Sequence, residues 1–425
     1  MIIGLYFDCY KKSGGIYQYA LNLLEAVKSH NEHSYVVFNL SKDFPFTEYS
    51  NLKNWKIINL IPLDEGYIHS TPGLALNFFS FRRKFNLFVI NFLRRLHLYS
   101  LEIKLTSLNA RRRAKIFSRY NIDLMLYHTF SELSFLTEIP GIVPIHDLHH
   151  KIHPELPEVS QFGQYRIREY LINNIKKKAY KIIVNTKTCK EDLVRLYNIH
   201  PDKIHIMPFP PASYINSTVT ENAKQKVKEK FNLPNRYVFY PAQFWPHKNH
   251  RNLVKAIGLL RDEGEDVHAV FVGSKREIWG EFERICKLID ELSLSERIHF
   301  LGYVDNADMP ILFDLATAVT IIPLFGYGFT YPVLEAWKMK RPLICANARE
   351  SREQVEDAAL FANPTDPKDI ALKIKMLVNN KKLSERLVRN GLKQLQLNSH
   401  ENLSKKIGEL ITMFDNEILR KTVKS

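Results

Sequence analysis

Short apolar runs alternate with amphipathic segments along the first half of the chain. Runs typical of strands lie at 2–7, 35–40, 55–60, 122–127, 142–146, 181–185 and 203–207, and helical patterns fill 16–29, 162–178 and 189–197. Alternation of strands and helices is typical of a doubly wound parallel sheet. We therefore expect an α/β domain over residues 1–215.

The same pattern starts again in the second half. A Pro-rich passage at 207–212 and a polar stretch at 217–225 predict a linker, which we place at 216–235. Strands are then expected at 237–242, 267–273, 298–303, 317–324 and 342–346, with helices near 249–262, 280–292, 307–314, 332–339 and 367–379. This predicts a second Rossmann-like domain over 236–395. The tail, 382–418, has two amphipathic helical patterns, and we expect the last part, 396–425, to cross back onto the first domain.

Composition supports a folded, two-domain protein. A chain of 425 residues, 45% apolar and 25% charged, fits two globular domains of roughly 200 residues each. The four cysteines are far apart and form no Cys-x-x-Cys pair, which favours a reducing compartment and argues against a zinc site. The N-terminus reads as a first strand rather than a signal peptide, and no apolar run is long enough to span a membrane.

Two polar segments follow strand patterns in the second half. They are 240–250, Tyr-Pro-Ala-Gln-Phe-Trp-Pro-His-Lys-Asn-His, and 326–336, Gly-Tyr-Gly-Phe-Thr-Tyr-Pro-Val-Leu-Glu-Ala. Each opens into a helical pattern, so both should reach the carboxyl edge of one parallel sheet, where α/β proteins bind ligands. We expect one polyanionic ligand there, a nucleotide diphosphate being the natural candidate.

Taken with other motifs, these segments resemble the GT-B glycosyltransferases of the retaining family-4 type, in the bacterial branch that builds O-antigens and other lipid-linked polysaccharides. The motifs that carry the resemblance are Ser13-Gly14-Gly15-Ile16-Tyr17, Ile145-His146-Asp147-Leu148-His149-His150 with Pro154-Glu155, Ile182-Ile183-Val184-Asn185, the 241–250 segment, Gly302-Tyr303 and Pro332-Val333-Leu334-Glu335-Ala336. The resemblance covers nearly the whole chain and implies two doubly wound domains facing across a cleft.

The resemblance implies roles for residues of the first domain. The loop at Gly14 and Gly15 is implied to touch the donor diphosphate or the acceptor; by itself, it is also explained by a tight turn before a helix. His146 is implied to position the donor sugar, whereas a histidine at the end of an apolar strand is ordinarily a core residue that donates to a backbone carbonyl. His149, His150 and His153 have no regular ligand spacing, so we expect no metal.

The second domain is expected to hold the donor. Lys248 would offset the charge on the leaving diphosphate, although an exposed lysine at a helix start explains it too. Similar enzymes usually carry an arginine where this chain has Gln243, which leaves one fixed cation. Glu335 is implied to bind the ribose hydroxyls; its other explanation is favourable placement near a helix N-terminus, worth about 0.3–1 kcal/mol.

The loop before Pro332 is expected to present free N–H groups to a phosphate or a sugar hydroxyl. Its residues are Gly328, Phe329, Thr330 and Tyr331. Tyr327 stands where the family has a glutamate that meets the transferred sugar, and Thr330 stands where a glycine is usual. These departures imply a different donor sugar, an altered geometry or no catalysis.

A basic, aromatic insert lies at 75–120 in the first domain. Between 81 and 120 there are eleven Lys/Arg and one acid, Glu102, a local net charge of +10 out of +15 for the chain. We expect it to lie on an anionic membrane surface near a lipid-linked acceptor, each basic residue contributing about 1 kcal/mol. The residues predicted to do so are Arg82, Arg83, Lys84, Phe85, Phe88, Arg94 and Arg95. A solvated helix face is the next alternative; nucleic acid is not expected, because no nucleic-acid module surrounds the insert.

These features predict a cytoplasmic enzyme, peripheral at the inner face of the membrane. The resemblance implies that it would transfer a hexosyl or deoxyhexosyl unit with retention from a UDP-, GDP- or dTDP-linked sugar to a lipid-linked glycan, without a metal or other cofactor. Partner glycosyltransferases are expected. The alternative from another class is a non-catalytic GT-B subunit that binds glycan or acts as a scaffold; epimerisation or hydrolysis of a nucleotide sugar is a third reading.

Overall fold

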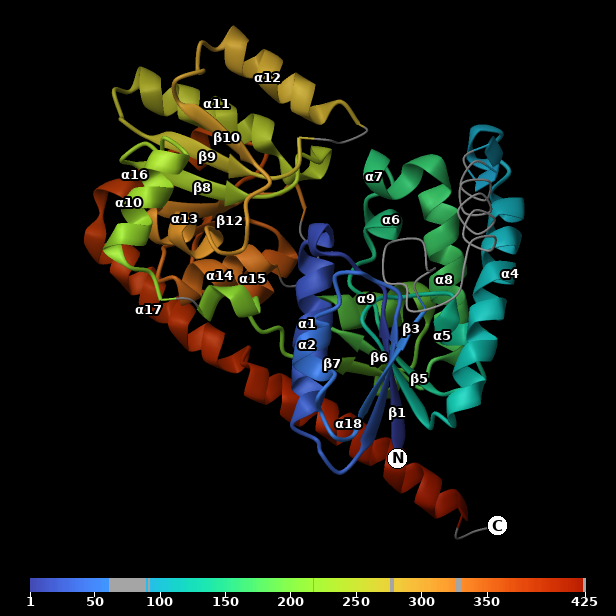
Figure 1. Cartoon of the computed structure of the whole chain (residues 1–425). Helices are drawn as coiled ribbons and strands as arrows, with labels where there is room; N and C mark the ends of the chain where they lie inside the picture. The colour runs from blue at the N-terminus through green and yellow to red at the C-terminus, as the bar shows by residue number, and fades with distance from the viewer. Residues whose placement is uncertain (61–88, 91, 217, 276–278, 326–329, 423–425) are drawn as a thin grey trace, which may run out of the picture.

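The chain folds into two α/β domains, each built around a parallel sheet (Figure 1). The structure is a computed structural model that describes residues 1–60, 89–90, 92–216, 218–275, 279–325 and 330–422. Within these residues, the first domain has a seven-stranded sheet and the second a six-stranded sheet. The predicted two-domain α/β fold is confirmed.

The first sheet has the strand order β3-β2-β1-β4-β5-β6-β7, and all its pairings are parallel. Its strands are β1 (Ile2–Phe7), β2 (Ser34–Asn39), β3 (Trp55–Asn59), β4 (Leu124–Tyr127), β5 (Gly141–Pro144), β6 (Lys181–Val184) and β7 (Ile204–Ile206). Its helices are α1 (Gly15–Lys28), α2 (Phe46–Tyr49), α4 (Tyr99–Phe117), α5 (Leu133–Leu136), α6 (His149–Ile152), α7 (Pro157–Ser160), α8 (Gln164–Lys178) and α9 (Lys187–Tyr197). The strand order reverses between β1 and β4, and a ligand crevice of an open sheet lies at such a point.

The second sheet has the order β10-β9-β8-β11-β12-β13, again parallel. Its strands are β8 (Tyr237–Pro241), β9 (His268–Val272), β10 (Ile298–Gly302), β11 (Ala318–Ile321), β12 (Leu343–Ala346) and β13 (Leu360–Ala362). Its helices are α10 (Glu221–Lys230), α11 (His250–Asp262), α12 (Glu281–Glu291), α13 (Met309–Leu315), α14 (Tyr331–Lys338), α15 (Arg349–Val355) and α16 (Pro367–Asn379). Here the order reverses between β8 and β11. Both polar segments singled out in the sequence follow these two strands.

The segment predicted as a linker contains a helix of the second domain. Thr220 caps α10 by accepting a hydrogen bond from the Ala223 N–H at 3.3 Å. Lys224 and Lys230 then form ion pairs with Asp314 and Asp308, at 2.7 Å and 2.6 Å. The chain therefore enters the second domain before its first strand begins.

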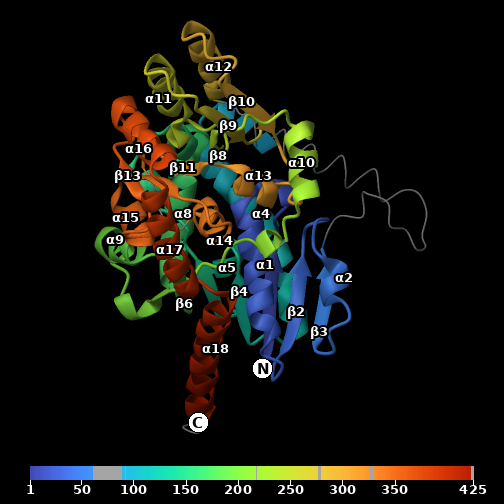
Figure 2. The same cartoon turned by 90° about the vertical axis from the view of Figure 1, so that its left-hand side faces the viewer.

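The tail forms α17 (Lys381–Leu397) and α18 (His400–Thr422), and α18 crosses back beneath the first domain (Figures 1 and 2). Ser404 lies against the end of α1, where its hydroxyl is 2.7 Å from the Ser29 hydroxyl and 2.7 Å from the Ala26 carbonyl oxygen. Further along α18, Glu417 accepts a hydrogen bond from the Tyr180 hydroxyl at 2.8 Å. The last helix thus ties the second domain to the first.

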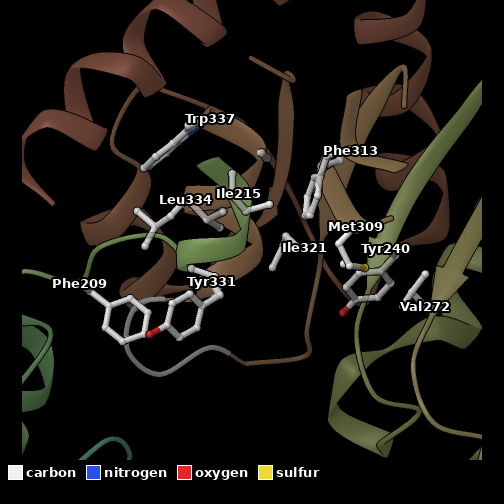
Figure 3. Packing of buried hydrophobic residues seen from close by; sticks show 14 of the residues in the cluster. Phe209, Ile215, Tyr240, Val272, Met309, Phe313, Ile321, Tyr331, Leu334 and Trp337 are labelled. Atoms are coloured by element: carbon white, nitrogen blue, oxygen red, sulfur yellow. The ribbon is translucent and has the colours of Figure 1, made fainter. Parts of the chain in front are cut away.

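Aromatic packing connects the domains near the start of α14. Tyr331 lies against Phe209, which follows β7, with ring centroids 4.5 Å apart (Figure 3). The Tyr331 hydroxyl accepts a hydrogen bond from Asn22 of α1 at 3.1 Å. A Cβ atom on Gly15 would lie 3.2 Å from the Tyr331 ring, so glycine allows the close approach of α1 to α14.

A second contact joins α15 of the second domain to α9 of the first. The Glu353 carboxylate accepts hydrogen bonds from the backbone N–H groups of Lys187 and Thr188, the latter at 2.8 Å. Arg349 pairs with Glu191 at 2.5 Å and with Asp192 at 3.4 Å. The carboxylate of Glu353, a residue of α15, lies at the N-terminus of α9. Both hydrogen bonds and the dipole of α9 therefore favour its negative charge. We call this the α15–α9 contact.

We expect the substitution Glu353→Ala to open the two domains without unfolding either. Loss of a charged cap costs about 1–2 kcal/mol, which shifts the closed-to-open ratio about 5- to 30-fold. Small-angle scattering would show a larger radius of gyration for the variant. Arg352→Ala is the matched control, because Arg352 contacts Asn347 and Phe361 within its own domain. An unchanged radius in Glu353→Ala would show that the contact does not hold the domains closed.

Candidate functional site

The candidate site lies where the carboxyl edges of the two sheets face each other. In the first domain, Gly14 has φ +59° and ψ −120° and directly precedes α1. This positive φ favours glycine, and a Cβ atom there would meet no atom of the described residues within 4 Å. The backbone beside Gly14 is therefore open to a ligand at the N-terminus of a 14-residue helix.

His146 follows β5 and is half-buried. Its Nε2 lies 2.9 Å from the backbone oxygen of His128, and Tyr19 packs edge-on against its ring at 4.8 Å. Burial lowers the pKa of His146, so the neutral ring donates Nε2–H to that oxygen. The bond to a backbone carbonyl is the one expected of an ordinary core histidine. The role of His146 in positioning a donor stays a prediction.

Lys248 ends a 3-10 turn, Pro246–Lys248, that joins β8 to α11. Its side chain is half-buried, and among the described residues no hydrogen bond or ion pair holds its ammonium group. Burial lowers its pKa, while the nearby charges of Glu158 and Asp147 raise it. Removing an ammonium group even partly from water without a direct partner is costly, and a bound anion would offset that cost.

Gln243 is engaged with the backbone of its own domain. Its side-chain oxygen accepts a hydrogen bond from the Ser274 N–H at 3.0 Å. The neighbouring Gly273 admits no side chain, because a Cβ atom would lie 2.3 Å from the Ala242 carbonyl oxygen. Gln243 therefore braces the loops after β8 and β9, and its contact with a donor stays a prediction.

The loop before α14 is described only from Thr330 onward; the predicted residues Tyr327, Gly328 and Phe329 lie outside the described residues. The expectation of a free N–H at Thr330 is wrong, because this group donates to the Gln354 side-chain oxygen at 3.2 Å. Gln354 in turn donates to the Thr330 carbonyl oxygen at 3.4 Å. The Thr330 hydroxyl oxygen, however, is buried and has no hydrogen-bond partner within the described part of the chain. Tyr331 is buried in the contact between the domains described above.

Glu335 is 2% exposed, in the second turn of α14. It accepts a hydrogen bond at 2.5 Å from the hydroxyl of Tyr214, which lies in the segment between the domains. Burial raises the pKa of Glu335 to about 7, and the hydrogen bond from Tyr214 lowers it by less. Binding of ribose by this carboxylate stays a prediction.

Two features at the cleft were not found from the sequence: Glu158 and the Asp147–Arg168 pair. Glu158 lies on α7 of the first domain, yet its carboxylate contacts His247 of the second domain. Arg168 donates to Asp147 at 2.5 Å. Burial raises the pKa of Asp147, but Arg168 and His149 lower it more, so the pKa lies below its ordinary value. Asp147 and Arg168 are brought together by the fold of the first domain, and Glu158 and His247 by the contact between the domains. The sequence pattern predicts neither contact.

The basic insert is described in part. Arg82, Arg83, Lys84, Phe85 and Phe88 lie outside the described residues. Arg94 is held by the buried Glu102, to which it donates from Nε at 2.9 Å and from Nη2 at 2.7 Å, whereas Arg95 is exposed. Helix α4 lies on the outer side of the first domain (Figure 1). It exposes apolar and basic side chains together: Leu101, Lys104, Leu108, Arg111, Arg112 and Lys115, here called the α4 face.

Two negative findings concern the described residues only. No helix among them is both long enough and apolar enough to cross a bilayer. No group of three or more His, Cys, Asp or Glu side chains among them is arranged to hold a metal ion.

The raised pKa of Glu335 predicts a pH-dependent stability. Between its ordinary value of 4.5 and about 7, the folded protein keeps a proton that the unfolded chain has released. The free energy of unfolding therefore falls as pH rises through this window, by about 3 kcal/mol in full. The free energy of unfolding of Glu335→Gln, measured in urea, is compared with that of the wild type at each pH. The difference should favour the variant more at pH 8 than at pH 5. Equal differences at both pH values would contradict the raised pKa; Glu401→Gln, at an exposed site, is the control.

Two family models match successive parts of the chain. The model for glycosyltransferase family 4 matches residues 13–209, and the model for glycosyl transferases group 1 matches residues 221–394. The boundary between the matches falls at the passage between the two domains. Each model thus covers one domain.

Two similar proteins are named as sugar transferases. The O-antigen chain mannosyltransferase B of Escherichia coli is 28% identical over 248 residues, which are 58% of this chain and 64% of the relative. The N-acetylgalactosamine-N,N'-diacetylbacillosaminyl-diphospho-undecaprenol 4-alpha-N-acetylgalactosaminyltransferase of Campylobacter jejuni is 24% identical over 190 residues, 44% of this chain and 47% of the relative. The chain therefore matches less than two thirds of the length of either.

Solved structures share the whole fold. The structure of HepE from Anabaena in complex with UDP and glucose superposes with a TM-score of 0.69 at 16% identity, over 97% of this chain and 100% of HepE. At this low sequence identity, the structural similarity supports a common fold and nothing further. With one family model on each domain and this fold, the chain is a GT-B glycosyltransferase of the family-4 type.

Proposed function

We propose that this protein transfers a hexosyl unit, with retention, from a nucleotide-diphosphate sugar to a glycan carried on a lipid diphosphate. Mannose is the first candidate for the sugar, because the Escherichia coli relative is named a mannosyltransferase. The Campylobacter relative is named for a diphospho-undecaprenol acceptor, which supports a lipid-linked acceptor. HepE was solved with UDP and glucose, which supports a nucleotide-sugar donor.

The observation that carries the proposal is the Lys248 ammonium at the reversal point of the second sheet. It is half-buried, lies between β8 and α11, and has no direct partner among the described residues. Gly14 lies at the corresponding point of the first sheet, with open backbone at a helix N-terminus. A diphosphate between them would receive a positive charge from one domain and helix-end N–H groups from the other.

The chemistry we propose needs positioning and charge stabilisation rather than a protein nucleophile. The bond from the anomeric carbon to the donor phosphate oxygen breaks, and the acceptor hydroxyl oxygen bonds to the same face of that carbon. The departing diphosphate oxygen takes the acceptor proton. Lys248 stabilises the negative charge that develops on the diphosphate, and closure of the domains brings donor and acceptor together. We propose that no metal takes part.

The test of this function is transfer from a panel of labelled nucleotide sugars, including GDP-mannose, UDP-glucose and dTDP-rhamnose, to membrane glycolipid. We expect transfer from one donor in the wild type. Lys248→Ala should lower kcat by about 100-fold or more, because one electrostatic contact to the leaving group is lost. Its circular dichroism should stay that of the wild type. Lys255→Ala, at an exposed site on α11, is the matched control.

Failure of the wild type to bind UDP, GDP or dTDP in calorimetry would refute the proposal. It would favour the reading of the chain as a glycan-binding scaffold. Unchanged turnover in Lys248→Ala would remove Lys248 from the site while leaving the function in place.

We also propose that the α4 face rests on an anionic membrane surface. Leu101 and Leu108 are 48% and 51% exposed and lie seven positions apart, on one side of the helix with basic residues around them. Such a face would place apolar side chains among acyl chains and basic ones among headgroups. The remaining basic residues of the insert would add to the attraction.

Substituting Arg111, Arg112 and Lys115 by alanine should weaken binding to vesicles that contain anionic phosphatidylglycerol. Three charges at about 1 kcal/mol each predict a loss of about 100-fold, smaller at high salt. Co-sedimentation measures it. The control changes Lys382, Arg386 and Lys393, exposed on α17, and removes the same charge. Equal loss in both triple variants would show only a dependence on net charge.

A further inference from the structure

Glu158 is a buried carboxylate that the first domain places against the second. It lies on the short helix α7, and its side chain is only 3% exposed. The neighbouring Leu156 and Val159 pack with Phe325 of the second domain in a small apolar cluster. Phe325 also lies against the rings of His153 and His247, at 4.3 Å and 5.1 Å between centroids. Packing from both domains therefore sets the position of this carboxylate.

One oxygen of Glu158 is satisfied and the other is not. Oε1 accepts hydrogen bonds from the His247 backbone N–H, at 3.2 Å, and from the His247 ring Nδ1. Oε2 is buried and has no hydrogen-bond partner among the residues that the structure describes. Leaving a buried acceptor unpaired is unfavourable, and more so when the group is charged. An unpaired oxygen of this kind therefore calls for an explanation.

Glu158 keeps its charge at neutral pH. Burial raises its pKa, but the hydrogen bonds from His247 lower it more, so the pKa lies below its ordinary value. Burial and the charge of Lys248 lower the pKa of His247 to about 4, so this ring is neutral and donates Nδ1–H. The histidine thus supplies a hydrogen bond and no neutralising charge.

Glu158 binds His247, the residue directly before Lys248, so the carboxylate and the ammonium group are neighbours between the domains. Asp147 is already paired with Arg168. Lys248 feels the charge of Glu158 but forms no ion pair with it among the described residues. The lysine therefore lacks an anion, and the carboxylate oxygen lacks a hydrogen-bond donor. A sugar phosphate carries both, an anionic phosphate and, a few bonds away, hydroxyl donors on the ring.

We infer that Oε2 of Glu158 accepts a hydrogen bond from a hydroxyl of the transferred sugar, which makes Glu158 a residue that sets donor-sugar specificity. This inference rests on the proposed function, since it requires a nucleotide-sugar donor. Because Glu158 comes from the first domain and Lys248 from the second, the sugar itself would bridge the domains. The nucleotide alone would leave Oε2 unpaired, so the bare nucleoside diphosphate would not gain this contact.

Calorimetry on the full chain tests the inference with four ligands: GDP-mannose against GDP, and UDP-glucose against UDP. Glu158→Gln keeps an oxygen for His247 and places an NH₂ group where an acceptor stood. In the wild type, the accepted nucleotide sugar should bind more tightly than its nucleotide. In Glu158→Gln, this advantage should shrink by about 10- to 100-fold, the value of a hydrogen bond to a charged group, while the affinity for the nucleotide changes little.

Monodeoxy analogues of the accepted donor provide a second readout. The analogue that lacks the contacted hydroxyl should bind the wild type about tenfold or more weakly than the parent donor, and should bind Glu158→Gln as the parent does. Glu155→Gln is the matched control, because Glu155 lies on the same segment, is 65% exposed and pairs only with His153 among the described residues. It should behave as the wild type.

The outcomes separate the two proposals. If the wild type binds a nucleotide sugar and Glu158→Gln keeps the full advantage of sugar over nucleotide, the inference is overturned and Glu158 only holds His247. Equal weakening of nucleotide and nucleotide sugar also overturns it, since that marks a contact that closes the domains. If the wild type binds no nucleotide and no nucleotide sugar, the proposed function fails, and the inference fails with it.

Discussion

The Lys248 ammonium lies half-buried between two domains, and in the described part of the chain no carboxylate is close enough to pair with it. Burial works against that charge, and the more distant carboxylates of Asp147 and Glu158 partly offset this effect. Both of these acids are engaged elsewhere, Asp147 by Arg168 and Glu158 by His247. The site therefore holds a positive charge in a fixed position without neutralising it. A site that binds phosphate needs this property.

This arrangement depends on how the two domains meet. Tyr331 packs between Gly15 and Phe209, so the start of α14 and the start of α1 come together at the cleft. Gln354 holds the backbone of Thr330 from α15, and its neighbour Glu353 caps α9 of the first domain. Two consecutive residues of one helix thus touch the loop before α14 and the opposite domain. Movement of the domains would therefore reach Thr330 through α15.

Much of the fold could be predicted from the sequence, because the alternation of apolar strands and amphipathic helices is a local signal. The helix expected near 249–262 is α11, and its residues Leu253, Ile257 and Leu260, which recur at helical spacing, are all fully buried. The three-residue strand β13 was missed, since it is too short and only partly buried to show a period. The helix α10 was missed because its sequence is strongly polar and only Val227 is buried on it.

For the site, the sequence determined which loops reach the sheet edges, since polar residues after β1, β5, β8 and β11 must emerge at carboxyl ends. Only the tertiary structure decided which polar groups at these sheet edges remain without a hydrogen-bond partner. The Thr330 N–H donates to Gln354, and Arg94 donates to Glu102. One oxygen of Glu158 has no partner among the residues that are described. Each of these pairings joins residues that are not neighbours on any single strand or helix. Hydrogen bonding depends on distances of about 3 Å in three dimensions, and no period along a chain encodes those distances.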